Sequence, residues 1–293
     1  FSRGQRPRRS LGGPATPFGT RIASVESFNR RVMRTKGGTP ATEAGTVGPD
    51  TEEAIEIGLA YLANTQNGDG SWSLQGHGEN VLLRSNTAAT GLCLLAFQGA
   101  GYTHRQHQHA VTISRGIEFL LNQQQTNGDL YVPEDAVSNQ NVAFYSHGIA
   151  ALALCEAYGM TQDPDLKEPA QRCLDFVIST QHTERGGWWY AAQVSSDTSV
   201  TGWMMMALKS GQLSGLEVPD ETYQGIQRWL GISQVPQQPD RYRYNPYAPD
   251  TPSQRHGRTA TPTMTSVGML MRMYSGWRRD NEAMKSAAEY LLQ

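Results

Sequence analysis

Apolar residues recur along the chain at intervals of three and four, the spacing that places them on one face of an α-helix. The stretch GLAYLANTQ ends at Gln66, and two later stretches match it, GIEFLLNQQ ending at Gln124 and CLDFVISTQ ending at Gln181. A weaker copy, GIQRWLGIS, follows at residues 225–233, and SAAEYLLQ at the C-terminus begins a fifth. The nearly constant spacing predicts a chain of repeated units, each opening with an amphipathic helix.

A second and far more apolar stretch follows each amphipathic one after a polar turn. The four read TGLCLLAF, HGIAALAL, TGWMMMAL and VGMLMRMY, and their glycines align at Gly91, Gly148, Gly202 and Gly268. A helix that is apolar nearly all round must be buried on every side or line an apolar cavity, so we expect these helices inside and the amphipathic ones outside. Glycine costs a helix about 1 kcal/mol relative to alanine, so four in register predict close helix packing.

Polar residues stand five positions ahead of three of these glycines. They are Asn86, Asp197 and Thr263, whose side chains are of the kinds that cap helix N-termini. We expect all three to be caps. For Asp197 the alternative is a catalytic carboxyl group.

The composition is that of a globular protein. The 293 residues are 38% apolar and carry a formal net charge of -2, which gives no general attraction to nucleic acid. The apolar runs are too short to span a membrane. Cys93, Cys155 and Cys173 lie inside apolar helical patterns without CxxC spacing, which predicts buried, reduced thiols rather than disulfides or a zinc site.

Residues 1–48 differ from the rest in being rich in Arg, Gly, Pro, Ser and Thr. They contain too little apolar surface to offset the entropy of ordering, so we expect a disordered basic tail or linker, with peripheral contact to an anionic membrane as the alternative. A cytoplasmic or membrane-associated protein is expected. The remaining residues, 49–293, are expected to form one domain of hairpin units at about 53–110, 111–169, 170–223, 224–284 and a partial 285–293.

A helix ending in glutamine, a glycine turn and an aromatic residue resembles the prenyltransferase and squalene oxidase repeat, called the QW repeat in terpene cyclases. The resemblance covers residues 50–293, and the matched pairs are Gln66 with Trp72, Gln124 with Tyr131, and Gln181 with Trp188. It implies an all-α fold, an α/α toroid in which inner and outer rings of helices surround an apolar cavity. A closed toroid of this family needs more hairpins than the chain carries, so we expect the toroid to be incomplete at the C-terminus.

The chemistry of that family matches only in part. Squalene-hopene cyclases protonate a polyene with an Asp-x-Asp-Asp-Thr motif, and the aligned residues here are Val194, Ser196, Asp197 and Thr198. Serine therefore stands where the proton donor would be. Protein prenyltransferases hold zinc with an Asp-x-Cys pair and a distant histidine, and the chain has no Asp-x-Cys. We expect no cofactor and no metal.

The candidate site residues lie around the third turn and the inner helices. Asp197 and His147 are the candidate catalytic groups, because equivalent positions of successive hairpins point to one end of a toroid. Aromatic faces for an apolar ligand or a cation would come from Tyr145, Trp189, Tyr190 and Trp203. The alternatives are core packing for the tryptophans and a capping or core role for His147.

Two further clusters carry weaker signals. His104, His107 and His109 fall within six residues and could bind a metal, but no further ligand is fixed nearby, so we expect a solvated loop. The stretch RYRYNPY at residues 241–247 interleaves arginine and tyrosine, which suits stacking and phosphate contacts, a lid over the cavity, or a plain surface crossing.

The sequence thus predicts a repeat protein with an apolar central cavity that binds an apolar, isoprenoid-like ligand or a partner peptide. Nucleic acid is not expected as a partner. The alternative is an isoprenoid cyclase, a terpenoid-cyclase-like isomerase or lyase, in which Asp197 or another carboxylic acid takes the place of the missing donor. Ligand, oligomeric state and complete termini stay open.

Overall fold

The structure is a computed structural model that describes residue 28, residues 49–78 and residues 80–293. Almost all regular structure in these residues is helical, which confirms the all-α prediction. The helices are α2 (Pro49–Asn64), α3 (Asn86–Gly99), α4 (Ala110–Gln123), α5 (Ala136–Thr161), α6 (Pro164–Ser179), α7 (Thr198–Ser214), α8 (Asp220–Ser233), α9 (Pro262–Tyr274) and α10 (Glu282–Leu291). A small antiparallel hairpin of β1 (Gln234–Val235) and β2 (Gln238–Tyr242) and a 3₁₀ turn (Arg255–Arg258) precede α9.

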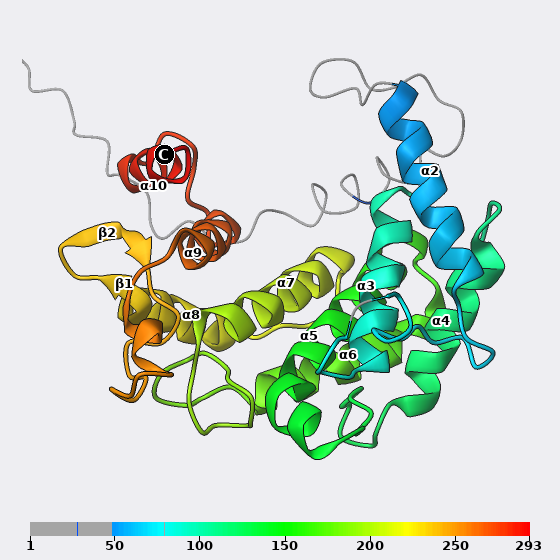
Figure 1. Ribbon diagram of the computed structural model, residues 1–293, viewed down its shortest axis with the longest axis horizontal. Helices are drawn as coiled ribbons and strands as arrows, with labels where there is room; N and C mark the ends of the chain where they lie inside the picture. Colours follow the sequence, from blue (N-terminus) through cyan, green and yellow to red (C-terminus); the bar gives the residue numbers. More distant parts are fainter. Residues whose placement is uncertain (1–27, 29–48, 79) are drawn as a thin grey trace, which may run out of the picture.

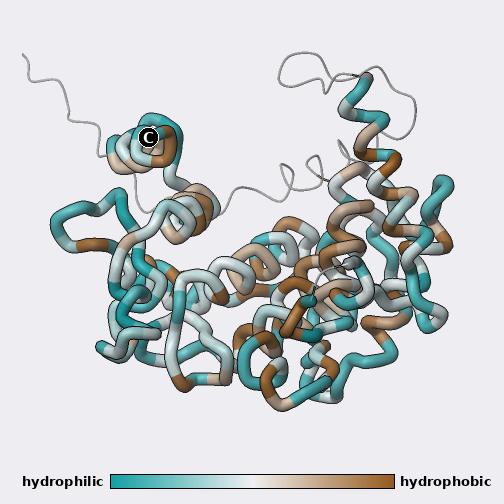
Figure 2. Tube along the Cα trace, viewed as in Figure 1, coloured by the Kyte–Doolittle hydropathy of each residue, from teal (hydrophilic) through white to brown (hydrophobic). Residues whose placement is uncertain are grey.

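The helices follow one another as hairpins arranged in an arc (Figure 1). Helices α3, α5, α7 and α9 pack side by side along the arc, and α4, α6, α8 and α10 pack against them. The hydrophobic segments gather on the middle helices, whereas the connecting loops at the periphery are mostly hydrophilic (Figure 2). The predicted order of apolar helices inside and amphipathic helices outside is therefore the observed one.

Small and flexible apolar side chains allow the inner helices to pack closely. Ala150, Ala151 and Ala153 of α5 are fully buried, as are Met204 and Met205 of α7. The outer helices bury a single stripe each, as their three- and four-residue spacing predicts. The core thus follows the row of inner helices rather than filling one central point.

The aligned glycines mark the contacts between successive inner helices. A Cβ atom at Gly91 would lie 3.1 Å from the backbone of Ala150, and one at Gly202 would lie 2.7 Å from Val267. Gly148 likewise meets the side chains of α7, so the predicted close packing is confirmed at these three. Gly268 differs, because its neighbour is the ring of Tyr242 rather than another helix.

The predicted helix caps are confirmed at one place and wrong at two. Asp197 is the N-cap of α7, and its side chain accepts a hydrogen bond from Val200. Asn86 and Thr263 are not caps, because they already lie inside helices whose N-caps are Ser85 and Thr261. The cap is fixed by where the backbone becomes extended, and the packing glycines do not stand at a constant distance from that point.

The glutamine of each turn joins its own hairpin to the next one. Gln66 donates hydrogen bonds of 2.9 Å to the carbonyls of Gly70 in its turn and Thr112 in α4. Gln181 does the same with Gly186 and Thr222 of α8, at 2.8 and 2.9 Å. A primary amide carries two N–H groups, so one side chain can serve the turn and the following outer helix together.

The aromatic residue after the turn closes the end of the preceding outer helix. The indole Nε1 of Trp72 donates to the carbonyl of Leu62 at 2.7 Å, and that of Trp188 donates to Val177 at 2.8 Å. Carbonyl groups in the last turn of a helix lack an intrahelical partner, and these bonds supply one. Trp188 is thus a packing residue, the role that the alternative interpretation gave to the tryptophans.

Gln181→Leu is expected to lower the free energy of unfolding by about 1–3 kcal/mol, because two half-buried carbonyl groups lose their donor. Urea unfolding followed by circular dichroism measures the change. Gln123→Leu is the matched control, since Gln123 is exposed at the end of α4, and it should stay within about 0.5 kcal/mol of the parent. Equal effects of the two substitutions would contradict this role of Gln181.

Most of the predicted basic tail, residues 1–27 and 29–48, lies outside the described residues. Phe28 is described, and its side chain is only 2% exposed. Its ring lies against Gly159 of α5, where a Cβ atom would be 2.5 Å from the ring. Phe28 therefore contributes to packing on the inner helices.

The cysteine prediction holds for the described residues. All three cysteines are free; Cys155 and Cys173 are buried, and Cys93 is half-buried. Burial raises the pKa of the Cys93 thiol to about 12, which keeps it protonated and unreactive. In the part of the chain that the structure describes, no helix has the length and apolar character needed to cross a membrane.

Candidate functional site

Asp197 lies where the third turn meets the start of α7, and its side chain is fully buried. Its Oδ1 atom accepts a hydrogen bond of 2.7 Å from the backbone N–H of Val200. Its Oδ2 atom accepts one of 3.0 Å from the hydroxyl of Tyr244, which lies in the long connection between β2 and α9. Both carboxyl oxygens are thus engaged by the protein itself.

The connection that carries Tyr244 is fastened at both sides of that residue. Thr198 donates its backbone N–H to the carbonyl of Tyr244 at 2.9 Å and its hydroxyl to the carbonyl of Arg243 at 2.6 Å. The guanidinium of Arg243 donates to the carbonyls of Ile232 and Ser233 at the end of α8. These bonds fix the backbone, so the Tyr244 hydroxyl is held over the Asp197 carboxyl group.

A chain of tyrosines continues from Asp197. The hydroxyl groups of Tyr244 and Tyr190 share a short hydrogen bond. The ring of Tyr190 stacks on Trp189 with centroids 4.9 Å apart, and it lies 6.0 Å from the ring of Tyr145 on α5. The structure therefore brings together Asp197 and three of the four predicted aromatic residues.

Burial controls the protonation of this cluster. It raises the pKa of Asp197 to about 7, and the hydrogen bonds from Val200 and Tyr244 offset the effect only in part. Burial and the nearby Asp197 charge also raise the pKa of Tyr244 and of Tyr145 well above their usual range. At neutral pH the tyrosines are hydrogen-bond donors, and Asp197 keeps its proton to a higher pH than an ordinary aspartate does.

Trp203, the fourth predicted aromatic residue, is half-buried on α7. It faces α5 at Gly148, where a Cβ atom would lie 3.3 Å from the Trp203 Cβ. Gly148 is one turn beyond Tyr145 on the same helix. Trp203 therefore belongs to the same pair of inner helices as the cluster, and none of the described ring contacts joins it to the stacked pair of Trp189 and Tyr190.

The residues aligned with the missing aspartates differ in their burial. Ser196 is fully buried, whereas Val194 is 61% exposed in the turn. Neither position supplies a carboxyl group to the cluster. Asp197 is the carboxyl group that the described contacts place there.

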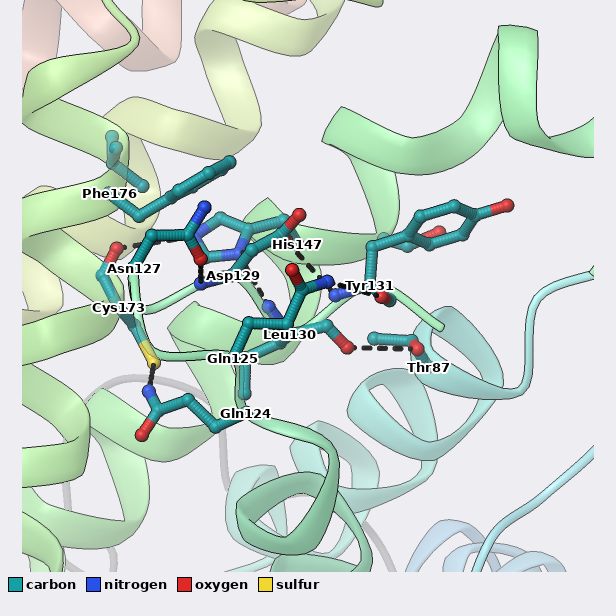
Figure 3. A network of polar contacts seen from close by, with 12 residues as sticks. Thr87, Gln124, Gln125, Asn127, Asp129, Leu130, Tyr131, His147, Cys173 and Phe176 are labelled. Atoms are coloured by element: carbon teal, nitrogen blue, oxygen red, sulfur yellow. Dashed lines mark hydrogen bonds and ion pairs between the residues drawn. The ribbon is translucent and has the colours of Figure 1, made fainter. Parts of the chain in front are cut away.

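His147 occupies the core of the second hairpin (Figure 3). Its Nδ1 atom accepts the backbone N–H of Leu130 at 3.2 Å, and its Nε2 atom donates to the carbonyl of Cys173 at 3.2 Å. Asp129 lies 3.1 Å from Nδ1, and the ring of Phe176 covers the imidazole at 4.4 Å.

Threonines take the same place in the neighbouring hairpins. Thr90 accepts the backbone N–H of Trp72, and Thr201 accepts that of Trp188, each at 3.0 Å. His147 does this for the second turn, where Leu130 is the donor. The geometry around His147 is that of a structural residue, and a catalytic role for it stays a prediction.

The histidine-rich connection differs from the expected solvated loop. The side chain of His104 is 9% exposed and lies 2.8 Å from the carboxylate of Asp163, the N-cap of α6. His109 is buried edge-on against Tyr102. The expectation was wrong for His104 and His109, because Asp163 and the ring of Tyr102 contact them between neighbouring hairpins. His107 is exposed, as expected. Among the described residues, no group of three or more potential ligands could hold a metal ion.

Tyr244 is the residue of this site that sequence reasoning did not assign. The stretch 241–247 stands out by its alternation of arginine and tyrosine, yet nothing in that pattern links it to Asp197. The link comes from the backbone bonds that dock the connection on the start of α7. Only an insertion of unusual length between two repeated helices hints at a segment that covers another part of the fold.

The fold of the chain is similar to that of terpene cyclases. The solved structure of the type II terpene cyclase MstE from Scytonema aligns with a TM-score of 0.51 at 15% identity over 92% of this chain and 66% of that chain. A substituted form of that cyclase, in complex with its substrate geranylgeranyl dihydroxybenzoate, aligns with a TM-score of 0.51 at 16% identity over 92% of this chain and 67% of that chain. A protein from Actinoplanes aligns with a TM-score of 0.50 at 13% identity over 92% of this chain and 70% of that chain.

These likenesses concern the fold alone, and the chain spans about two thirds of the length of the cyclase. No family model matches the sequence. No curated protein matches it either.

Proposed function

We propose that the chain is a binding module that holds an isoprenoid-bearing ligand against its inner helices and leaves that ligand chemically unchanged. The observation that carries the proposal is that the protein itself buries and hydrogen-bonds the carboxyl group of Asp197. Its side chain is fully buried, and each carboxyl oxygen already accepts a hydrogen bond from the protein. A general acid must come within hydrogen-bond distance of the atom that it protonates, and this carboxyl group is covered by Tyr244.

The choice of ligand rests on the aromatic residues of the inner helices and the turn beside them. Tyr145, Tyr190 and Trp203 are half-buried, so each keeps part of its ring available to an apolar partner. The similar cyclase from Scytonema holds a geranylgeranyl dihydroxybenzoate in its complex. An isoprenoid chain is accordingly a better-supported ligand than a partner peptide or a membrane surface.

A second candidate function is that of an isoprenoid cyclase with Asp197 as a displaced acid. One observation favours it, because burial raises the pKa of Asp197 to about 7, and a proton donor must hold its proton at neutral pH. The substrate would have to displace Tyr244 to reach the carboxyl group. That requirement makes the cyclase the second candidate rather than the first.

Titration of the full chain with geranylgeranyl dihydroxybenzoate is expected to quench tryptophan fluorescence in a saturable way, and mass spectrometry should recover the ligand unchanged. Trp203→Leu is expected to weaken binding about tenfold, because a large apolar contact is lost. Trp277→Leu is the matched control, a half-buried tryptophan that packs under Arg272 at the end of α9. It should leave the affinity nearly unchanged.

The same experiment distinguishes a binding module from a cyclase. Conversion of the ligand to a cyclised isomer that is lost in Asp197→Asn would overturn the binding proposal and support the cyclase. Absence of saturable binding would overturn it as well. Equal weakening by the two tryptophan substitutions would remove Trp203 from the proposed site.

A further inference from the structure

A basic pocket that Asp197 does not line lies between the β1–β2 hairpin, the segment at residues 258–260 and α10. Its volume is about 630 Å³. Three arginines line it, Arg241, Arg243 and Arg258, together with polar groups of Gln238 and Thr259. No acidic residue is among the lining residues. The pocket is large enough for a small ligand, since such sites span about 300–1,000 Å³.

Each of the three arginines is held in place through one side of its guanidinium group. Arg243 donates Nε and Nη2 to carbonyl groups at the end of α8. Arg258 donates Nε to the carbonyl of Ala248, and Arg241 lies 3.8 Å over the ring of Tyr290. Arginines fixed in this way lose little further side-chain entropy when they bind.

The opposite side of each guanidinium is available to a ligand. Nη2 of Arg241, Nη1 of Arg243 and Nη2 of Arg258 form no hydrogen bond or ion pair with the described residues. Nη groups of arginine are strong donors that favour anionic oxygens. The pocket therefore presents several N–H groups of fixed position to whatever enters it.

The charge of the pocket is only partly compensated. Asp240 pairs with Arg241 and also accepts from Ser286 of α10, so it neutralises one of the three charges. Asp250 lies 3.8 Å from Arg258, but its side chain is 72% exposed, and an exposed pair of this kind contributes little. Arg243 has no carboxylate partner among the described residues, because backbone carbonyls hold it. The pocket is left with a net positive charge.

We infer that this pocket binds a phosphate or diphosphate group. A carboxylate has two oxygens and one negative charge. Three guanidinium groups offer more hydrogen-bond donors and more positive charge than one carboxylate can satisfy. Phosphate and diphosphate offer three or more anionic oxygens that point in different directions, and arginine is the side chain that matches such groups best. Thr259, whose side chain carries a hydroxyl group, is also among the lining residues.

Isothermal titration of the full chain with pyrophosphate tests this inference. One-to-one binding is expected, and Arg258→Gln should weaken it about tenfold or more, because charge-assisted hydrogen bonds are lost. Arg241→Gln is the second variant, and it keeps the test decisive if Arg258→Gln fails to fold. Arg243 is left intact because it also holds the end of α8.

Arg278→Gln is the matched control, since Arg278 is 86% exposed and does not line the pocket. It should bind pyrophosphate as the parent does. A lack of saturable binding by the parent, or equal weakening by Arg278→Gln and both pocket variants, would overturn the inference.

The phosphate group can belong to a soluble molecule or to a lipid headgroup. Phosphatidylcholine vesicles that contain phosphatidic acid distinguish the two sources. Cosedimentation that is lost in Arg258→Gln assigns the group to a lipid, and absence of cosedimentation with retained pyrophosphate binding assigns it to a soluble molecule.

Discussion

Asp197→Asn is expected to raise the free energy of unfolding at pH 8 by up to about 4 kcal/mol, although it removes the candidate acid. Burial raises the pKa of Asp197 from the model value of 3.8 to about 7 in the folded protein. Above pH 7 the folded chain must therefore hold a buried charge that the unfolded chain carries freely in water. Asparagine carries no charge, so the variant avoids that cost.

The pH dependence follows from the same shift. Below about pH 4 both states hold the proton, and the carboxyl group has no effect on stability. Between about pH 4 and 7 only the folded state holds it, so the stability of the parent falls by up to about 1.4 kcal/mol per pH unit. Above pH 7 the loss is complete. The variant should lack this decline.

Asparagine can also keep the local geometry. Its side-chain oxygen can accept from Val200 as the Asp197 oxygen does, and asparagine is among the best N-cap residues. Its amide can donate to the Tyr244 hydroxyl, which then donates to Tyr190. The helix cap and the tyrosine chain therefore survive the substitution.

Urea unfolding from pH 5 to pH 8 checks this prediction, with Asp135→Asn as the control. Asp135 is also an N-cap aspartate, but hydrogen bonds from Ser138 lower the pKa of its carboxyl group. Its substitution should therefore not produce a gain in stability at high pH. An Asp197→Asn variant that still loses stability between pH 5 and pH 7 would show that the decline arises elsewhere.

Features of the fold that depend on spacing could be predicted from the sequence. The recurring Gln66 and Gln181 predict turns that the structure joins to the next outer helix by the same pair of bonds. Gly91 and Gly202 predict close contacts that are present. These signals are local or strictly periodic, so a single sequence contains them in full.

Features that depend on where a helix begins were harder to predict. Helix α5 starts at Ala136, capped by Asp135, well ahead of the apolar stretch that begins at His147. Near its start, residues 138–141 are four consecutive polar residues, which no apolar periodicity marks. Helix starts are set by a backbone change at one residue, which composition over a window does not resolve.

The sequence predicted only the part of the candidate site that lies in the third turn. Asp197 and its neighbours Trp189 and Tyr190 lie in one turn and could be singled out together. Tyr244 comes from a distant insertion, and its bond to Asp197 depends on the docking of that segment by Thr198. No local pattern encodes such a contact. The cover over Asp197 decides whether the carboxyl group is accessible, so the function could not be judged from the turn alone.

Gly128→Ala is expected to lower the free energy of unfolding by about 2–5 kcal/mol, because it affects both the turn and the next hairpin. Gly128 has a φ angle of +93°, which an L side chain rarely adopts. A Cβ atom there would lie 2.1 Å from the carbonyl oxygen of Arg172 in α6. Backbone atoms cannot rotate away, so the whole of α6 would have to shift.

The same arrangement recurs at the turns on either side. Gly70 and Gly186 have φ angles of +90° and +79°, and Cβ atoms there would lie 2.4 and 2.0 Å from carbonyl oxygens of α4 and α8. The backbones of α4, α6 and α8 therefore each lie directly against the glycine of the preceding turn. Glycine at this place is a condition for stacking one hairpin on the next.

Gly76→Ala separates the cost of the left-handed backbone conformation from the cost of the contact with α6. Gly76 has a φ angle of +90°, but no atom lies near its Cβ position. It should lose only about 1–2 kcal/mol, the cost of the left-handed backbone conformation. The difference between the two variants in urea unfolding then measures the contact between the turn and α6. If both variants lose the same amount, the glycines serve the turns alone, and the stacking of hairpins must rest on the glutamine bonds and the apolar core.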